Sequence, residues 1–223
     1  MQPDPTAPRV EILYRDEHIV VLDKPSGLAV HRGWATDRVT AMTVARAKTR
    51  RHVHPVHRLD RGTSGVLVFA FDPETASLLS AQLREHAVEK RYLALVRGVT
   101  PEQGRIDHPV PRSPKGPRAD AVTAYVRLGV ALDRYSLVEV APETGRLHQI
   151  RRHMKHINHP LIGDTRYGDG RENRKLRTEH GLARLALHAS SVSFAHPHGG
   201  AAIHIVAPLP DDLRAPLAHM GFR

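Results

Sequence analysis

A short polar turn that leads directly into a continuous apolar run is the feature that most constrains this sequence. The turn spans residues 57–65, and residues 66–71 follow it as an uninterrupted apolar run. Such a run, bounded by turn residues, is typical of a strand that is buried on both faces. We therefore expect the turn to lie at the edge of a protein core, with a buried strand behind it.

One carboxylate, Asp60, lies within this turn, and the sequence around it is strongly basic. The basic neighbours are Arg46, Lys48, Arg50, Arg51, Arg58 and Arg61. An ionised carboxylate at the mouth of a buried strand is suited to act as a nucleophile or a general base. The alternative is a turn-forming aspartate on a solvated basic surface. Composition alone favours that alternative, because charged side chains usually face water.

The pattern of apolar residues predicts more strands than helices along the chain. Strands are expected at 10–14, 19–22, 66–71, 90–98, 121–128, 135–140, 185–194 and 202–206. Helices are expected at 41–48, from Asp72 onward, at 144–158 and at 211–220, because Asp72-Pro73 is a typical helix start. The two kinds of element do not alternate regularly, which favours an α+β fold with a mixed, mostly antiparallel central sheet flanked by helices and loops.

The domain organisation is expected to be simple. No internal repeat or long linker divides the chain, so residues 1–223 are predicted to form one domain, with residues 1–9 as a disordered tail. Residues 108–118 hold four prolines together with Arg112, Lys115 and Arg118, and they are expected to form a basic loop that is a candidate contact for RNA. Residues 168–181 are glycine-bounded and highly charged, and they are expected to be a surface insertion.

The segment 144–158 has the clearest helical period, and it carries two neighbouring arginines. Its apolar stripe consists of Leu147, Ile150, Met154 and Ile157. Arg152 lies opposite this stripe, whereas Arg151 lies on its shoulder and should be half-buried. A half-buried arginine needs a partner, usually a carboxylate, and no local partner is evident.

Composition narrows the function classes. The 33 Lys and Arg residues against 23 Asp and Glu residues give a net charge of +10, which favours a polyanionic partner. Aromatic residues make up only 4% of the chain, which argues against a module that stacks bases on an aromatic sheet. The absence of Cys excludes disulfides, thiolate nucleophiles and Cys-ligated zinc. No signal peptide or membrane-spanning run is visible, so we expect a cytoplasmic protein.

Seventeen histidines raise the question of a metal site. The best-spaced candidates are His153, His156 and His159, but no carboxylate or third ligand completes a known metal-binding spacing. We therefore expect no metal.

The turn at 57–65 resembles the signature of the RluA-type pseudouridine synthases, and further stretches agree in order and spacing. These stretches are Asp23-Lys24-Pro25-Ser26-Gly27-Leu28, Lys90-Arg91-Tyr92, Thr144–Arg151, His159-Pro160-Leu161-Ile162-Gly163-Asp164 and Leu187-His188-Ala189. Together they cover roughly residues 10 to 210. The resemblance implies the pseudouridine synthase fold, with a catalytic cleft across the sheet, and a reaction that needs no metal or organic cofactor.

The same resemblance implies roles for individual residues. Asp60 corresponds to the catalytic aspartate, and Arg151 corresponds to the arginine that pairs with it. Tyr92 corresponds to the tyrosine that packs on the target base and helps to remove the C5 proton. We therefore expect Asp60 and Arg151 to lie within salt-bridge reach at the base of a basic cleft, with Tyr92 beside them.

The implied substrate is structured RNA. Residues expected to bind RNA or to assist base flipping are Arg58, which matches the residue that fills the space of the extruded nucleotide, Arg61, Arg146, His148, Arg152 and Lys155. The segments 30–34, 151–156 and 168–174 further resemble a bacterial subgroup of the family that modifies uridine 65 in the T stem of tRNA. The signature begins too early in the chain for an N-terminal S4 domain, so none is expected. No obligate protein partner or membrane association is expected, and the protein should be a monomer.

Two other functions remain open at the level of sequence. One is a pseudouridine synthase that acts on ribosomal RNA or on another tRNA position, which the catalytic residues do not distinguish. The other is a non-enzymatic RNA-binding or folding factor, against which the presence of Asp60, Tyr92 and Arg151 weighs.

Overall fold

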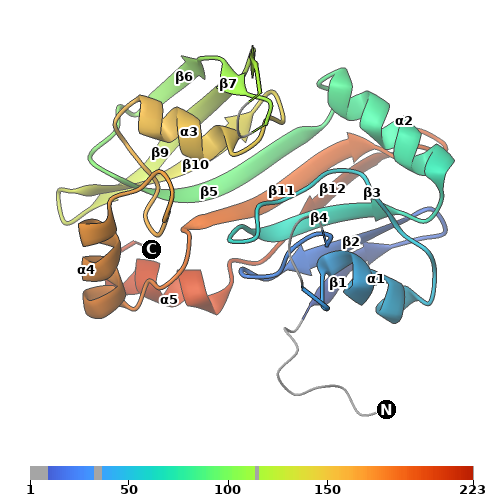
Figure 1. Cartoon of the computed structure of the whole chain (residues 1–223), viewed down its shortest axis with the longest axis horizontal. Helices are drawn as coiled ribbons and strands as arrows, with labels where there is room; N and C mark the ends of the chain where they lie inside the picture. Colours follow the sequence, from blue (N-terminus) through green and yellow to red (C-terminus); the bar gives the residue numbers. More distant parts are fainter. Residues whose placement is uncertain (1–9, 33–36, 114–115, 223) are drawn as a thin grey trace, which may run out of the picture. The chain divides into compact units, whose positions relative to one another are not determined.

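The computed structural model, drawn in Figure 1, describes residues 10–32, 37–113 and 116–222. The chain divides into two compact units. The first unit contains the described residues up to Val88 together with Ser191–Pro208. The second contains Glu89–Ser190 and the described residues from Leu209 onward. The predicted disordered tail at 1–9 lies outside the described residues, and so does part of the motif at 30–34.

The first unit is a set of antiparallel strands with two helices. Its strands are β1 (Glu11–Arg15), β2 (Ile19–Lys24), β3 (His54–Pro55), β4 (Ser64–Ala70), the later part of β11 (Leu187–Ala195) and β12 (Ala202–Val206). The order is β1-β2-β4-β11, with β3 paired to β4 and β12 to β11. Every residue of β4 is buried, as the apolar run predicts, and it packs with β2, β11 and β12 in one core. The helices are α1 (Ala41–Thr49) and α2 (Pro73–Arg84).

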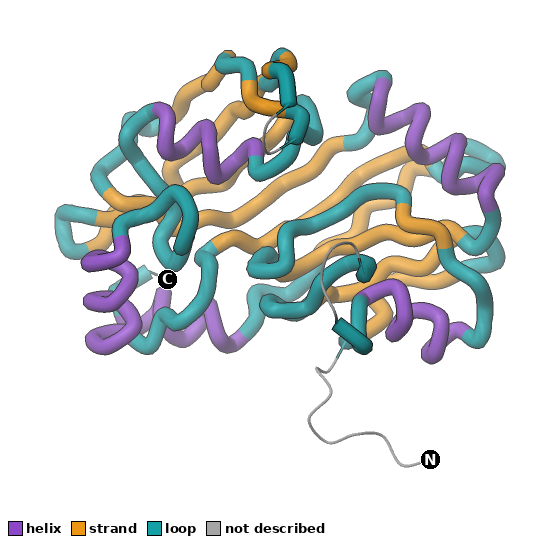
Figure 2. The backbone as a smooth tube through the Cα atoms, in the orientation of Figure 1, coloured by secondary structure: helices purple, strands orange, loops and turns teal. Residues whose placement is uncertain are grey.

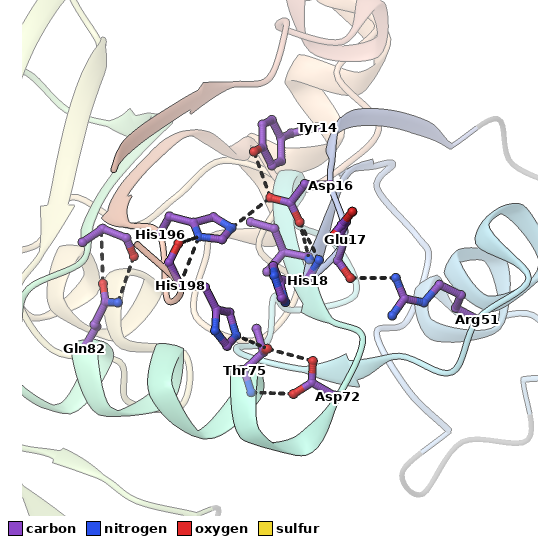
Figure 3. Close-up of polar contacts among 12 residues, drawn as sticks. Tyr14, Asp16, Glu17, His18, Arg51, Asp72, Thr75, Gln82, His196 and His198 are labelled. Atoms are coloured by element: carbon purple, nitrogen blue, oxygen red, sulfur yellow. Dashed lines mark hydrogen bonds and ion pairs between the residues drawn. The ribbon is translucent and has the colours of Figure 1, made fainter. Parts of the chain in front are cut away.

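A polar network ties two turns of the first unit to the start of helix α2 (Figure 3). Asp16 closes the β1–β2 turn, because its carboxylate accepts the backbone N–H groups of His18 and Ile19 at 2.7 and 2.8 Å. The other carboxylate oxygen of Asp16 lies 3.0 Å from Nε2 of His196, on the turn between β11 and β12. His198 of the same turn contacts the Thr75 hydroxyl at 3.0 Å.

The N-terminus of α2 shows the predicted cap. The Asp72 carboxylate accepts the backbone N–H of Thr75 at 2.7 Å, and Pro73 occupies the first helical position. This cap satisfies one of the backbone donors that a helix start leaves open, and the pKa of Asp72 is lowered chiefly by that hydrogen bond.

The second unit contains the longer antiparallel strands and three helices. Its strands are β5 (Glu89–Arg97), β6 (Gln103–Asp107), β9 (Val122–Ala131), β10 (Tyr135–Pro142) and the start of β11, in the order β11-β5-β10-β9-β6. A separate hairpin joins β7 (Val110–Pro111) and β8 (Arg118–Ala119). The helices are α3 (Gln149–His156), α4 (Gly170–His180) and α5 (Asp211–His219).

Two cores lie on opposite faces of β5 because side chains alternate along a strand. Ala94 and Val96 belong to the core that contains Ile150 and Met154 of α3, whereas Leu95 belongs to the core that contains Leu176 of α4. The centre of β5 is therefore buried on both faces, as its sequence predicts. Figure 1 shows α3 against β9 and β10.

Two sequence-based expectations in this unit need correction. The helix predicted from residue 144 begins only at Gln149, because His148 has a left-handed backbone with φ of 53° and the Gln149 side chain binds Thr144 and the N–H of Arg146. The segment 168–181 is more than a surface insertion. Its residues 170–180 form α4, and although most of them are exposed, Leu176 is fully buried in a core of the second unit.

The basic loop predicted at 108–118 contains the β7–β8 hairpin. The α+β, mostly antiparallel architecture is confirmed. No helix among the described residues is long and apolar enough to cross a membrane.

Candidate active site and RNA-binding residues

The loop between β3 and β4, drawn in teal with the other loops in Figure 2, carries Asp60. Asp60 is half-buried. Its carbonyl accepts the backbone N–H of Thr63 at 3.0 Å, which closes a tight turn immediately before the buried strand. Leu59 is buried on one side of Asp60, and Thr63 is buried on the other. The carboxylate is therefore carried by a short segment whose two ends are fixed in the core of the first unit.

A second loop, which follows β2, anchors this turn from within. Lys24 is fully buried, and its ammonium donates to the carbonyls of Pro25, Leu28 and Arg61 at 3.0, 2.8 and 3.2 Å. Ser26 donates to the carbonyl of Gly62 at 2.8 Å, and the N–H of Gly27 donates to that of Arg61, also at 2.8 Å. The two loops that carry the family resemblance are thus joined by direct hydrogen bonds.

The sequence did not identify Lys24 as a buried residue. Lysines are almost never fully buried unless their charge is matched by partners. The Lys-Pro-Ser-Gly sequence at 24–27 is typical of an exposed turn. The signal was its position at the end of a strand and directly before Pro25-Ser26-Gly27, where a turn leaves backbone carbonyls that need donors.

Arg58 and Arg61, both predicted to bind RNA, have different environments. Arg58 is exposed. Arg61 forms a two-pronged ion pair with Asp37, whose pKa is lowered chiefly by this hydrogen bond. The charge of Arg61 is therefore already matched by a carboxylate within the first unit.

Arg151 lies on α3, and its side chain is only 12% exposed. Its guanidinium binds Asp164 in a bidentate manner, with Nε–Oδ2 and Nη2–Oδ1 distances of 2.7 and 2.9 Å. The half-buried position was predicted correctly, but the statement that no local partner exists is wrong. Asp164 lies only 13 residues further along the chain, in a loop that returns to α3.

The carboxylate of Asp164 is fully buried. Its Oδ1 also accepts the backbone N–H groups of Arg166 and Tyr167 at 2.8 and 3.0 Å. Burial by itself raises the pKa of Asp164, but the hydrogen bonds from Arg151 and from these N–H groups outweigh it, and the pKa is lowered. Asp164 therefore remains ionised beside Arg151.

Tyr92 lies on β5 opposite Val140 of β10, and its side chain is half-buried against the core that contains α3. The structure thus places Tyr92 and Arg151 in the second unit, on elements that share one core. Asp60 belongs to the first unit. The expected pairing of Asp60 with Arg151 stays a prediction.

The remaining predicted RNA-binding residues lie at the start of α3 and along it. Arg146 is exposed and donates to the carbonyl of Asp120 at 3.2 Å. Lys155 is also exposed. His148 and Arg152 both contact the hydroxyl of Tyr167, at 3.1 and 2.9 Å. Tyr167 was not among the predicted site residues, because a tyrosine in a charged segment gives no distinctive pattern.

The histidines considered for a metal site do not converge. His153 is fully buried and contacts the Thr123 hydroxyl and the carbonyl of His108, both at 2.8 Å, which gives it a structural role. His156 stacks on His108 with ring centroids 3.7 Å apart. Among the described residues, no group of three or more His, Asp or Glu side chains is arranged to hold a metal ion.

This combination of fold and motifs is that of a known enzyme family. The family model described as RNA pseudouridylate synthase matches residues 18–156, which is more than half of the chain. The chain belongs to the RNA pseudouridylate synthase family, and it is accordingly an isomerase. The predicted RluA-type relationship is confirmed.

Among proteins of this family, the chain is similar to bacterial enzymes that are named for tRNA. The chain is 46% identical over 210 residues to tRNA pseudouridine synthase C of Haemophilus ducreyi, covering 84% of this chain and 86% of that protein. It is 40% identical over 235 residues to the protein of the same name from Yersinia pestis, covering 96% and 91% of the two chains. The predicted similarity to bacterial tRNA pseudouridine synthases is therefore confirmed.

Solved structures agree with the fold. Human RNA pseudouridylate synthase domain containing 4 has a TM-score of 0.77 and 27% sequence identity, with 94% of this chain and 92% of that chain covered. Human RNA pseudouridylate synthase domain containing 1 has a TM-score of 0.78 and 25% identity, with 97% and 90% covered.

Proposed function

We propose that this protein is a tRNA pseudouridine synthase that converts uridine 65 in the T stem of tRNA to pseudouridine. The observation that carries this proposal is the identity of 40–46% to relatives named tRNA pseudouridine synthase C over most of the chain. The net charge of +10 is consistent with an RNA substrate.

The proposed reaction isomerises one nucleotide without a cofactor. The bond between ribose C1′ and uracil N1 breaks, the base turns, and a new bond forms between C1′ and C5. N1 gains a proton and C5 loses one, so the atoms balance and no co-reactant is needed. The residues that act on the nucleotide must therefore supply a nucleophile or base and a route for the C5 proton.

Asp60 is the residue we assign to the first step. Attack on C1′, attack on the base and removal of a ribose proton all require an ionised carboxylate on a fixed segment. The hydrogen bonds from Lys24, Ser26 and Gly27 support this role, because they hold the turn that carries Asp60. Tyr92 is assigned to the base and its C5 proton, and Arg151 to the carboxylate of Asp60.

A uridine within a stem must leave the helix before it can react. Flipping costs a few kcal/mol of stacking and pairing, which contacts to the RNA backbone must offset. We assign these contacts to Arg58, Arg61, Arg146, His148, Arg152 and Lys155. The exposed positions of Arg58, Arg146 and Lys155 are consistent with this assignment.

The test is to incubate the purified protein with an unmodified tRNA transcript and to map pseudouridine chemically. Asp60→Asn should lower the rate by about a thousandfold or more, because the amide can neither attack nor accept a proton. Glu74→Gln, an exposed change in the first unit, is the control and should retain the wild-type rate.

A transcript with cytidine at position 65 tests whether uridine 65 is the target, independently of whether the protein makes pseudouridine at all. Product at another uridine would contradict the assignment of uridine 65 while supporting the enzyme class. A wild-type protein that makes no pseudouridine in tRNA, or an Asp60→Asn variant of full activity, would overturn the proposal. Mapping of total RNA from cells with and without the protein would then identify another RNA target.

A further inference from the structure

Tyr167 is the centre of an arginine cluster in the second unit. The guanidinium carbons of Arg151, Arg152 and Arg166 lie 5.1, 5.7 and 5.6 Å from the centroid of its ring. Arginine is attracted to an aromatic face at such distances, because the face carries partial negative charge. Three cations around one uncharged ring nevertheless leave a local excess of positive charge.

The three arginines differ in how their charges are matched. Arg151 is neutralised by Asp164 through the bidentate pair. Among the described residues, Arg152 donates to two uncharged oxygens, the Tyr167 hydroxyl at 2.9 Å and the carbonyl of Pro111 at 3.1 Å. Arg166 is exposed, and within the described part of the chain no carboxylate forms an ion pair with Arg152 or Arg166. About two positive charges at this cluster are therefore not matched by the protein itself.

The loop that carries Tyr167 is held firmly in place. The N–H of Gly163 donates to the Asn173 side chain at 2.7 Å, and that side chain donates in turn to the carbonyl of Asp164 at 3.0 Å. Gly163 has φ of 75°, and a Cβ atom at this position would lie 1.8 Å from the carbonyl oxygen of Arg184, which is a steric clash. Tyr167 thus offers a fixed hydroxyl and a fixed ring on which Arg152 is ordered in advance.

We propose that Arg152 and Arg166, held at Tyr167, form a binding site for a phosphodiester group of the RNA substrate. A guanidinium presents paired N–H donors that match phosphate oxygens, and prior ordering lowers the entropy cost of binding. Arg151 is not part of this phosphate site, because Asp164 neutralises its charge. Within the described residues, Asp164 forms no ion pair with Arg152 or Arg166. The inference rests on the proposed RNA substrate, and it adds Tyr167 and Arg166 to the residues that contact RNA.

The first test measures binding of the full-length protein to an unmodified tRNA transcript at several salt concentrations. Removing one phosphate contact should lower the slope of log affinity against log salt by about one. We expect this flattening, with affinity about tenfold weaker at low salt, for Arg152→Gln and for Arg166→Gln. Arg214→Gln is the matched control, because Arg214 is exposed and already paired with Asp211, and it should leave the slope unchanged.

The second test asks whether Tyr167 acts through Arg152. Tyr167→Phe keeps the ring but removes the hydroxyl that orders Arg152, so it should weaken tRNA binding severalfold. In a protein that already carries Arg152→Gln, the same change should cost much less, because interacting residues have non-additive effects. A purely structural role for Tyr167 would give equal losses in both backgrounds.

The results of these tests decide whether the phosphate site exists, independently of whether the protein is a pseudouridine synthase. Wild-type affinity and salt slope in both Arg152→Gln and Arg166→Gln would overturn the site, and so would equal losses for Tyr167→Phe in the two backgrounds. These are binding measurements, so they decide the question even if the protein makes no pseudouridine. Should Tyr167→Phe fail to fold, the exposed Arg166→Gln variant still gives the answer.

Discussion

At the scale of single residues, the protein places charges in its interior and matches each with several partners. Asp164 is buried and receives a bidentate arginine and two backbone N–H groups. Lys24 is buried and donates to three carbonyls. Matching of this kind is required because a buried charge without partners costs several kcal/mol. Both residues belong to the motifs that carry the family resemblance, and each fixes the backbone or side chain of a proposed catalytic residue.

The pair of Asp164 and Arg151 should make stability depend on pH. Removing one partner of a buried pair typically costs about 3–5 kcal/mol, so Asp164→Asn should lower the free energy of unfolding by about that amount at pH 7. The pKa of Asp164 is lowered by folding, so its contribution is present above the unfolded pKa of about 3.9 and is lost as the pH falls through the lower, folded value.

Urea unfolding of both proteins between pH 7 and pH 3 measures this effect, and the difference between them should narrow below about pH 4. Asp212→Asn is the control. The Asp212 side chain pairs with the largely buried Arg184 but is itself 57% exposed, so this pair should contribute less than the Asp164 pair does. A difference between wild type and Asp164→Asn that stays constant with pH would contradict the role of the charge.

At the scale of elements, regular structure serves mainly to hold irregular loops. The loop after β2 and the turn before β4 are joined by hydrogen bonds, while β2 and β4 themselves pair along six residues from Ile19–Ala70 to Lys24–Gly65. The turn of Asp60 is therefore fixed both by its strand and by the neighbouring loop. This arrangement suits a carboxylate that must meet its substrate in one orientation.

Lys24→Met should reveal how much the connection between these loops contributes. Methionine fills a similar volume but removes the donor from the carbonyls of Pro25 and Leu28, whereas the carbonyl of Arg61 keeps the N–H of Gly27. A buried carbonyl left without a donor costs about 1–3 kcal/mol. We expect a loss of about 3 kcal/mol in the free energy of unfolding, measured in urea, together with a lower rate of pseudouridine formation.

Lys48→Met in α1 is the same substitution at an exposed site of the same unit, and it should change stability by less than about 0.5 kcal/mol. If the two variants were equally stable, the buried hydrogen bonds of Lys24 would have no net effect. The predicted link between the two loops would then be wrong.

At the scale of the whole molecule, the proposed catalytic residues are distributed over both units. Asp60 belongs to the first, whereas Tyr92 and Arg151 belong to the second. The net charge of +10 is likewise a property of the complete chain. Surface charge of this kind speeds association with a polyanion, and its effect is screened by salt.

Binding of the whole protein to unmodified tRNA should therefore weaken steeply with salt. Between 50 and 200 mM KCl, we expect the Kd to rise by at least about tenfold, because each neutralised phosphate releases counterions. Filter binding at both concentrations measures the change, and urea unfolding at the same concentrations confirms that the protein stays folded. A Kd independent of salt would argue against recognition through the RNA backbone.

The sequence by itself determined the features that depend on neighbouring residues. The apolar run of β4, the cap at Asp72 and the burial of the centre of β5 on both faces follow from the run of apolar residues and from local turn chemistry, and the ordered motifs identified the family. The tertiary structure decided the partners of charged residues. Asp164 pairs with Arg151, the buried Lys24 donates to the loop that carries Asp60, and α4 contributes Leu176 to a core. Hydrogen bonds and burial of this kind depend on which distant segments of the chain pack together. The pattern of residues along the sequence does not specify those long-range contacts.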